Sequence, residues 1–324
     1  MKKLTINLPD RLDAETAAKY SADYLLTTLT AAPGPINPFT THLATSQGKG
    51  MRSKLLMACS IGDDGLVPQD IIYAAASVEI FHLATLVHDD IIDDADTRRG
   101  IQSVHARFGK KEAVICGDFL LCAALRIASF IEPPGLIEKF AQAVERVCLG
   151  EIRQLSNNYN SNLTLLEYLR TIRGKTAALF YICAYAGAMI SQSEQINQLS
   201  KFGTYFGMMF QMIDDCKDYT ETESLKPTKK DLLTGVINLP LLMAFIKEPG
   251  LRHIAKEVMA DPKNSNTLLD EVRRLCGVDD SHKLIARYEN KARAIIKTLK
   301  NRKKAEALEA LLNQLTVNLK EQHI

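Results

Sequence analysis

Two clusters of aspartates could do chemistry in this 324-residue sequence, and each follows a long apolar stretch. The first comes after the apolar residues 71–87 and contains Asp89, Asp90 and Asp93. On a helix with 3.6 residues per turn, Asp89 and Asp93 share one face, one turn apart, and Asp90 flanks them. Carboxylates this close repel one another by about 4 kcal/mol per pair near a protein surface, so a cation between them is favoured. Oxygen-only ligands of this kind suit Mg²⁺.

The same D-D-x-x-D spacing recurs at Asp214, Asp215 and Asp218, after another apolar stretch and 214 − 89 = 125 residues later. A single run of aspartates is most often a solvated loop or a helix end. The second copy is what favours a metal role. Two such helix ends facing each other would form a clamp for magnesium and a diphosphate.

The two aspartate motifs, with the Arg98-Arg99-Gly100 that follows the first, resemble those of the all-trans isoprenyl diphosphate synthases, within them the long-chain polyprenyl branch. The resemblance covers nearly the whole chain. It implies an isoprenoid-synthase fold, an all-α bundle of about ten or more helices around a central cavity. It also implies three Mg²⁺ ions per active site, with Asp89, Asp93, Asp214 and Asp218 as the metal ligands.

The segment QGKGMRSKLL resembles the family's G-K-x-x-R-P, which binds the diphosphate of isopentenyl diphosphate. Lys49 and Arg52 match, while Ser53 replaces the proline, a departure expected to affect loop rigidity more than charge. Gly48 and Gly50 would let the backbone approach a ligand closely. In isolation, paired Lys and Arg are a common solvated surface.

His82 lies seven residues before Asp89, close to two helical turns, and so on the same side. A lone histidine among apolar residues is more often a core residue, but the matching family residue contacts isopentenyl diphosphate. Glu79 and His82 also form an E-x-x-H. A di-iron site needs that motif twice, and because only one is found, that interpretation is rejected.

Guanidinium forks match phosphate oxygens, so Arg98 and Arg99 are candidates for two diphosphates. The resemblance assigns Arg98 to the allylic diphosphate and Arg99 to isopentenyl diphosphate. Pairing of these arginines with Asp93 or Asp96 could hold at the same time.

Further along, Lys175 and Thr176 resemble the family's K-T pair, and Gln211 matches its F-Q-x-x-D-D pattern. The segment 225–240 resembles G-K-P-x-G-x-D-L-x-x-G-K-x-T-L-P, so Lys226 is expected to close over the diphosphate. Departures from this pattern fall at Leu225, Lys229, Val236 and Asn238. The residues expected to take part in catalysis are Asp89, Asp90, Asp93, Arg98, Lys175, Thr176, Gln211, Asp214, Asp215 and Lys226.

Product length is expected to depend on the helix before Asp89, where small Ala84 and Thr85 would leave a tunnel open. Phe81 lies about 12 Å down that helix at 1.5 Å per residue and is the first large candidate for a floor. Phe140 or another ring is the alternative floor. Small side chains near Asp89 would leave the tunnel open, which favours a product of about six to eight isoprene units over one of three or four.

Helical periodicity recurs throughout and strand-like alternation is nearly absent, which predicts an all-α class. No linker rich in Pro, Gly or Ser divides the chain, so one domain spanning 1–324 is expected. Breaks between helices are predicted at 33–35, 62–65, 133–135, 157–162, 227 and 249–250. The window 71–87 is just under membrane-spanning length and carries Glu79 and His82, which disfavours a membrane span.

A net charge of +2 disfavours nucleic-acid binding. Seven scattered cysteines without C-x-x-C spacing indicate buried thiols in a reducing cytoplasm. The resemblance implies a Mg²⁺-dependent prenyltransferase that condenses isopentenyl diphosphate with an allylic diphosphate such as farnesyl diphosphate, for quinone side chains. It implies a homodimer or a hetero-oligomer with a small dissimilar subunit, and transient membrane contact during product release. The alternatives are a shorter-chain synthase, a class I terpene cyclase and a non-catalytic subunit.

Overall fold

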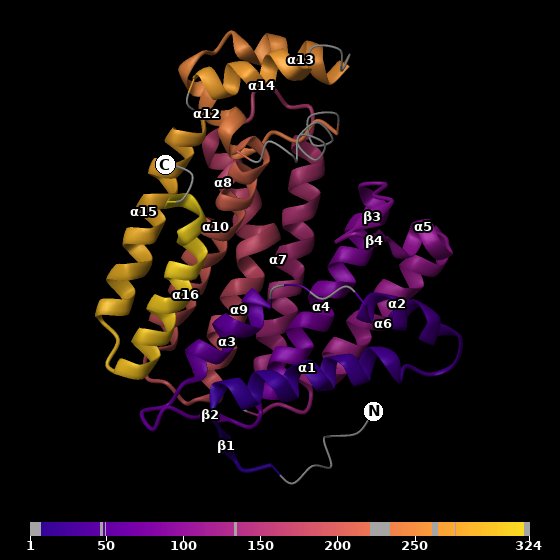
Figure 1. Ribbon diagram of the computed structural model, residues 1–324, viewed down its shortest axis with the longest axis vertical. Coiled ribbons are helices and arrows are strands. Elements are labelled where there is room, and N and C mark those ends of the chain that lie inside the picture. Colours follow the sequence, from indigo (N-terminus) through magenta and orange to yellow (C-terminus); the bar gives the residue numbers. More distant parts are fainter. Residues whose placement is uncertain are drawn as a thin grey trace. The chain divides into compact units, whose positions relative to one another are not determined.

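The computed structural model describes residues 8–45, 48, 50–132, 135–220, 234–260, 265–275 and 277–320 (Figure 1). Within these ranges almost all regular structure is helical, and the strands form two antiparallel pairs of two residues each. The predicted all-α class is confirmed. Contacts along the chain divide it into two compact units, one of residues 1–141, 182–200 and 299–308, the other of residues 142–181, 201–298 and 309–324. The single domain stays a prediction.

The first unit contains β1 (Arg11–Leu12), α1 (Ala14–Thr30), η1 (Gly34–Ile36), α2 (Asn37–Ala44), α3 (Met51–Ser60), β2 (Val67–Pro68), α4 (Ile71–Ile92), β3 (Thr97–Arg98), β4 (Ile101–Gln102), α5 (Val104–Phe108), α6 (Lys110–Ala128) and parts of α7 (Leu136–Asn157), α9 (Ala178–Ile190), α10 (Ile196–Thr220) and α16 (Arg302–Lys320). Helix α1 begins where the Asp13 carboxylate accepts a hydrogen bond from the Thr16 N–H, at 2.8 Å.

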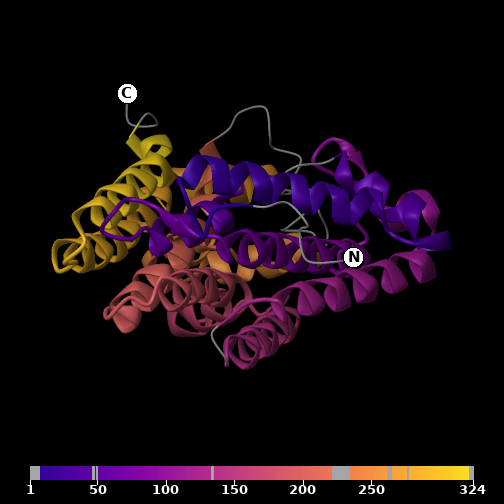
Figure 2. The same cartoon turned by 90° about the horizontal axis from the view of Figure 1, so that it is seen from below.

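Helix α4 is the core of the first unit. Every residue from 71 to 78 is buried, so the helix is covered on all faces. Helices α1 and α6 pack on different sides of it (Figure 2). With 22 residues, α4 is longer than the apolar window suggested and could span a bilayer by length. Because 67% of its most apolar window is buried inside the protein, α4 is a core helix.

Helix α4 ends in a Schellman motif rather than at a glycine or proline. The Ala95 N–H donates to the Asp90 carbonyl at 2.9 Å, and the Asp94 N–H donates to the Ile91 carbonyl at 3.4 Å. Asp94 takes the left-handed position, with φ of 48°, where aspartate is tolerated better than most residues. The helical geometry therefore continues through Asp93 before the chain turns toward β3.

The second unit contains α8 (Leu165–Ile172), the π-turn η2 (Arg173–Ala177), α12 (Leu239–Lys247), α13 (Leu251–Ala260), α14 (Ser265–Arg274), α15 (Gly277–Lys297) and the remaining parts of α7, α9, α10 and α16. A capping box between Thr164 and Glu167 starts α8. Helices α12, α13, α14 and α15 pack on one another (Figure 1).

The predicted breaks agree with the helix ends wherever the chain is described. The break at 33–35 falls between α1 and α2, that at 62–65 follows α3, and that at 157–162 separates α7 from α8. The breaks at 133–135 and 249–250 precede α7 and α13. Pro227 lies outside the described residues.

Candidate active site

The first aspartate motif occupies the last turn of α4. The Asp93 N–H donates to the Asp89 carbonyl at 2.8 Å, so these two residues are stacked one turn apart on the same face. Asp93 is exposed and Asp89 is partly buried. At both positions a carboxylate could bind a cation that enters from solution.

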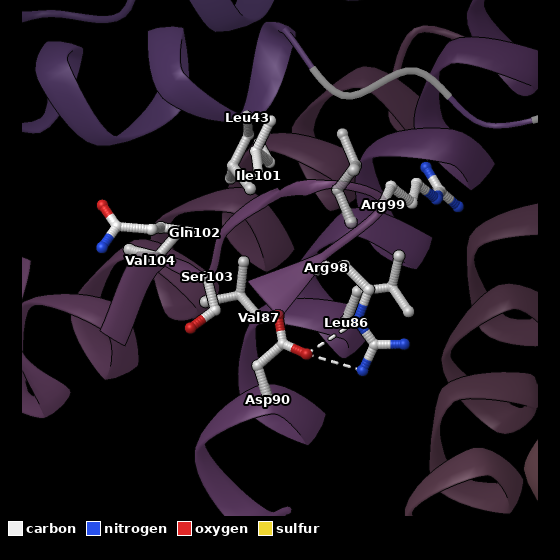
Figure 3. A pocket seen from close by; sticks show the side chains of 11 residues that line it. Leu43, Leu86, Val87, Asp90, Arg98, Arg99, Ile101, Gln102, Ser103 and Val104 are labelled. Atoms are coloured by element: carbon white, nitrogen blue, oxygen red, sulfur yellow. Dashed lines mark hydrogen bonds and ion pairs between the residues drawn. The ribbon is translucent and has the colours of Figure 1, made fainter. Parts of the chain in front are cut away.

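Asp90 points the other way, into the protein. It is only 4% exposed, and its Oδ1 atom accepts hydrogen bonds from Arg98 Nε at 2.7 Å and Arg98 Nη2 at 2.6 Å (Figure 3). Burial raises the pKa of Asp90, and the Arg98 guanidinium opposes that rise. Pairing of the two arginines with Asp93 or Asp96 was a possibility from the sequence. Arg98 instead pairs with Asp90, because the hairpin that follows α4 folds Arg98 back onto the buried side of the helix.

Asp90 and Arg98 line a small pocket between α2, α4 and the β3–β4 hairpin (Figure 3). Its other walls include Leu43, Leu86 and Val87. The space inside, ≈ 20 Å³, accommodates about one or two ordered water molecules and is too small for a substrate. The pocket is therefore not a substrate site, and its lining residues support the aspartate motif.

A two-residue turn separates the roles of the adjacent arginines. Thr97 pairs with Gln102 and Arg98 with Ile101, so Arg99 and Gly100 form the turn with φ of 52° and 81°. Positive φ at both positions is the requirement of a type I′ hairpin, and it directs Arg99 away from Arg98 (Figure 3).

Arg99 reaches the segment before α3. A Cβ atom at Gly48 would lie 2.8 Å from both Arg99 Nη1 and Nη2, so a side chain there would displace the Arg99 guanidinium. The close approach of a ligand to Gly48 stays a prediction. Gly50 takes the left-handed conformation, φ of 60°, just before α3 begins. Lys49 lies outside the described residues.

Helix α3 presents Arg52 and Ser53 to α4. Ser53 lies inside the first turn of the helix, so the expectation that its departure from proline affects loop rigidity is wrong. Its Oγ donates to Glu79 Oε1 at 2.7 Å and its N–H donates to the same oxygen at 3.2 Å. Burial lowers the pKa of Arg52, and the Glu79 carboxylate opposes this fall.

His82 lies one turn after Glu79, and its surroundings favour the neutral imidazole. Burial lowers its pKa well below the ordinary value, and the charges of Arg52, Arg99 and Arg98 lower it further. From the sequence, Glu79 was considered as half of a metal motif and as a charge that disfavours a membrane span. In the structure it accepts the hydrogen bonds of Ser53 and favours the charged form of Arg52. Its position one turn before His82 was the available signal for this role.

In the second unit, Asp214 and Asp215 divide their roles as Asp89 and Asp90 do. Asp214 is exposed, and its Oδ1 atom lies 3.4 Å from Lys217 Nζ. Asp215 is 8% exposed and accepts three hydrogen bonds, from Tyr168 Oη at 2.7 Å, Gln211 Nε2 at 2.9 Å and the Leu239 N–H at 3.0 Å. Burial raises the pKa of Asp215 to about 6 despite these donors. Asp218 belongs to α10, but its side chain is outside the described part.

The π-turn η2 carries the lysine and threonine of the K-T pair. Thr176 Oγ1 donates to Gln211 Oε1 at 2.7 Å, which joins the turn to α10. Lys175 Nζ lies 2.7 Å from Glu151 Oε2 on α7, and both side chains are mostly buried. Single π-helical turns within helices, such as η2, occur frequently at functional sites. Neither Glu151 nor Tyr168 was found by sequence reasoning, because nothing in the local pattern marks a partner on another helix.

Two glycines bring the π-turn directly against α7. A Cβ at Gly150 would lie 2.1 Å from the backbone nitrogen of Lys175. One at Gly174 would lie 3.0 Å from the Gly150 Cα. Any side chain at Gly150 would therefore push η2 away from α7 and separate Lys175 from Glu151.

The segment that ends at α12 is described only from residue 234, so Lys226, Leu225 and Lys229 lie outside the described residues. Asn238, which replaces the family threonine, is 5% exposed and accepts a hydrogen bond from Tyr219 Oη at 2.8 Å. Asn238 therefore makes a buried polar contact at the position where this chain departs from the family pattern.

Of the residues expected to control product length, Phe81, Ala84 and Thr85 lie on α4 and Phe140 lies on α7. Ala84 is 2% exposed, and the Thr85 hydroxyl donates to the His82 carbonyl at 2.8 Å. Phe81 and Phe140 are both buried and pack edge to face, with ring centroids 5.5 Å apart. The two rings that were alternative floors are therefore in contact, and replacement of one changes the support of the other.

A profile of the family described as polyprenyl synthetase matches residues 35–275. Component 2 of heptaprenyl diphosphate synthase from Bacillus subtilis is 34% identical over 277 residues, which cover 83% of this chain and 79% of that protein. The heptaprenyl diphosphate synthase structure from Staphylococcus aureus has a TM-score of 0.88 and 30% identity, covering 94% of this chain and 98% of its own. A geranylgeranyl pyrophosphate synthase structure from Lactobacillus brevis has a TM-score of 0.85 and 30% identity, covering 93% and 96%.

Proposed function

This chain belongs to the polyprenyl synthetase family and is a trans-prenyltransferase, and we propose that it condenses isopentenyl diphosphate with an allylic diphosphate such as farnesyl diphosphate. The observation that supports this most directly is the shared design of the two aspartate motifs. In each, the second aspartate is buried and hydrogen-bonded to the protein, while the first is less buried: Asp89 is partly buried and Asp214 is exposed.

The accessible carboxylates fit Mg²⁺. Asp89 and Asp93 share a helix face, Asp214 is exposed, and we assign Asp218 to the same set. Among the described residues, no three His, Cys, Asp or Glu side chains cluster closely enough to hold a metal. Few protein ligands per motif leave coordination positions for phosphate oxygens and water, which Mg²⁺ prefers. Three ions per active site are part of the proposal, and when bound they neutralise the charge of the departing diphosphate.

The basic groups of the first unit are proposed to hold isopentenyl diphosphate. Arg52 and Arg99 would bind its phosphates with Lys49, and neutral His82 would contribute a hydrogen bond. Guanidinium groups suit this task because their planar N–H forks match phosphate oxygens.

The second unit would hold the allylic diphosphate through Lys175, Thr176 and Gln211, with Lys226 closing over it. Because Asp90 occupies Arg98 Nε and Nη2, Arg98 would meet this diphosphate through its Nη1 edge. Asp90 and Asp215 then orient neighbouring groups and do not contact substrate. Among the described side chains we assign none as a general base. The proton lost after the isopentenyl double bond attacks the allylic cation is assigned to the released diphosphate.

We assign a long product, of about six to eight isoprene units, for quinone side chains. The solved heptaprenyl and geranylgeranyl synthases are both 30% identical to this chain, so similarity does not separate long from short products. Small Ala84 one turn before Asp89 favours the long product. A synthase of three or four units, limited by the Phe81 and Phe140 pair, is the alternative.

The similarity to a protein named component 2 supports a hetero-oligomer with a small dissimilar subunit, with a homodimer as the alternative. We place the enzyme in the cytoplasm, with transient membrane contact for product release. A terpene cyclase would need no counterpart of Arg52 and Arg99, and a non-catalytic subunit would be free to lose carboxylates that this chain retains.

The test uses the purified chain with farnesyl diphosphate, isopentenyl diphosphate and Mg²⁺, followed by chromatography of the products. Elongated all-trans polyprenyl diphosphates support the proposal. A cyclic hydrocarbon, or turnover that ignores isopentenyl diphosphate, would refute it. If the chain alone is inactive, addition of a small partner subunit must restore elongation.

A further inference from the structure

Ser53 forms a double hydrogen bond that ties the start of α3 to α4. Both its hydroxyl, at 2.7 Å, and its backbone N–H, at 3.2 Å, donate to Glu79 Oε1. The N–H of the third helical residue has no partner within the helix, so Glu79 satisfies a donor that would otherwise need water. A carboxylate in this place is also stabilised by the dipole of α3.

Glu79 is the carboxylate that offsets two arginine charges in the first unit. It favours the charged form of both Arg52 and Arg99, against burial that lowers their pKa values. Arg99 disfavours the charge on Arg52, and both arginines disfavour a charge on His82.

We propose that Ser53 and Glu79 are positioning residues for isopentenyl diphosphate. Their two hydrogen bonds fix the first turn of α3 against α4, and that turn carries Arg52, which is placed to receive the phosphates. The proposal rests on the function proposed above for Arg52.

Substitutions at Ser53 remove the two bonds one at a time. Alanine removes the hydroxyl bond and keeps the N–H bond, whereas proline removes both. Proline is tolerated in the first turn of a helix, so the fold should survive. The proline of the G-K-x-x-R-P pattern is therefore expected to impair this chain more than alanine does.

The experiment measures kcat and the KM of each substrate for Ser53→Ala, Ser53→Pro and Ser53→Thr. Loss of one or two such bonds predicts an isopentenyl diphosphate KM raised roughly threefold in Ser53→Ala and about tenfold in Ser53→Pro. Ser53→Thr keeps the hydroxyl and should stay near wild type. The KM of the allylic substrate should not change, because its proposed ligands lie elsewhere.

Ser60→Ala is the matched control. It lies on the same helix, is buried, and its hydroxyl donates at 2.8 Å to the Met57 carbonyl rather than to Glu79. This variant should leave both KM values unchanged even if it lowers the melting temperature.

An unchanged isopentenyl diphosphate KM in Ser53→Ala and Ser53→Pro would overturn the proposal, as would an equal rise in both substrate KM values. A wild-type protein that does not consume isopentenyl diphosphate would instead refute the proposed function. The two failures are distinguishable because the wild type is assayed first.

Discussion

Replacement of either Asp89 or Asp90 by alanine should separate metal binding from structural support. Asp90 is buried and its carboxylate accepts two short hydrogen bonds from Arg98. Loss of one partner from a fully buried ion pair costs about 3–5 kcal/mol. The Arg98 side chain is 36% exposed, so water can solvate part of the remaining charge and we expect about 1–3 kcal/mol for Asp90→Ala.

Asp89→Ala should behave in the opposite way. It removes one of two like charges stacked on a helix face, so the stability of the metal-free protein should be unchanged or higher. Turnover should fall by several powers of ten, because a proposed metal ligand is lost.

The assay is thermal unfolding followed by circular dichroism, with and without Mg²⁺ and a diphosphate, alongside turnover. Asp90→Ala should lower the Tm by about 2–6 °C and keep a Tm increase when Mg²⁺ and diphosphate are added. Asp89→Ala should lose most of that increase. The reasoning would be refuted if Asp89→Ala destabilised the metal-free protein as much as Asp90→Ala, or if it kept near-normal turnover.

Three further predictions concern other parts of the chain. Lys175→Ala should raise the KM of the allylic substrate. Because Lys175 and Glu151 form one ion pair, adding Glu151→Gln to Lys175→Ala should raise that KM no further. Additive losses in a double-mutant cycle would contradict this. Ala84→Phe should shorten the product to about three or four isoprene units without abolishing condensation, as seen by chromatography, since a buried methyl group becomes a ring. Iodoacetamide at pH 8 should label exposed Cys148 and spare Cys59, whose pKa burial raises to about 12, and peptide mass spectrometry would show rapid labelling of Cys59 if this is wrong.

The sequence by itself was sufficient to predict the helices and the chemistry they carry. The apolar window 71–87 and the spacing of Asp89 and Asp93 are local properties, since 3.6 residues per turn places the two aspartates on one face whatever packs nearby. Breaks such as 33–35 and 157–162 were predictable for the same reason, because proline, glycine and asparagine act on their own backbone.

Only the tertiary structure decided which polar side chains are accessible and which are held. Asp89 and Asp90 are adjacent and identical in type, yet Asp90 is buried because a hairpin eight residues on returns Arg98 to it. Ser53 meets Glu79 across 26 residues, and Tyr168 meets Asp215 across 47. Such pairings depend on which helices pack together, and a hydrogen bond between distant residues leaves no periodic trace in the sequence.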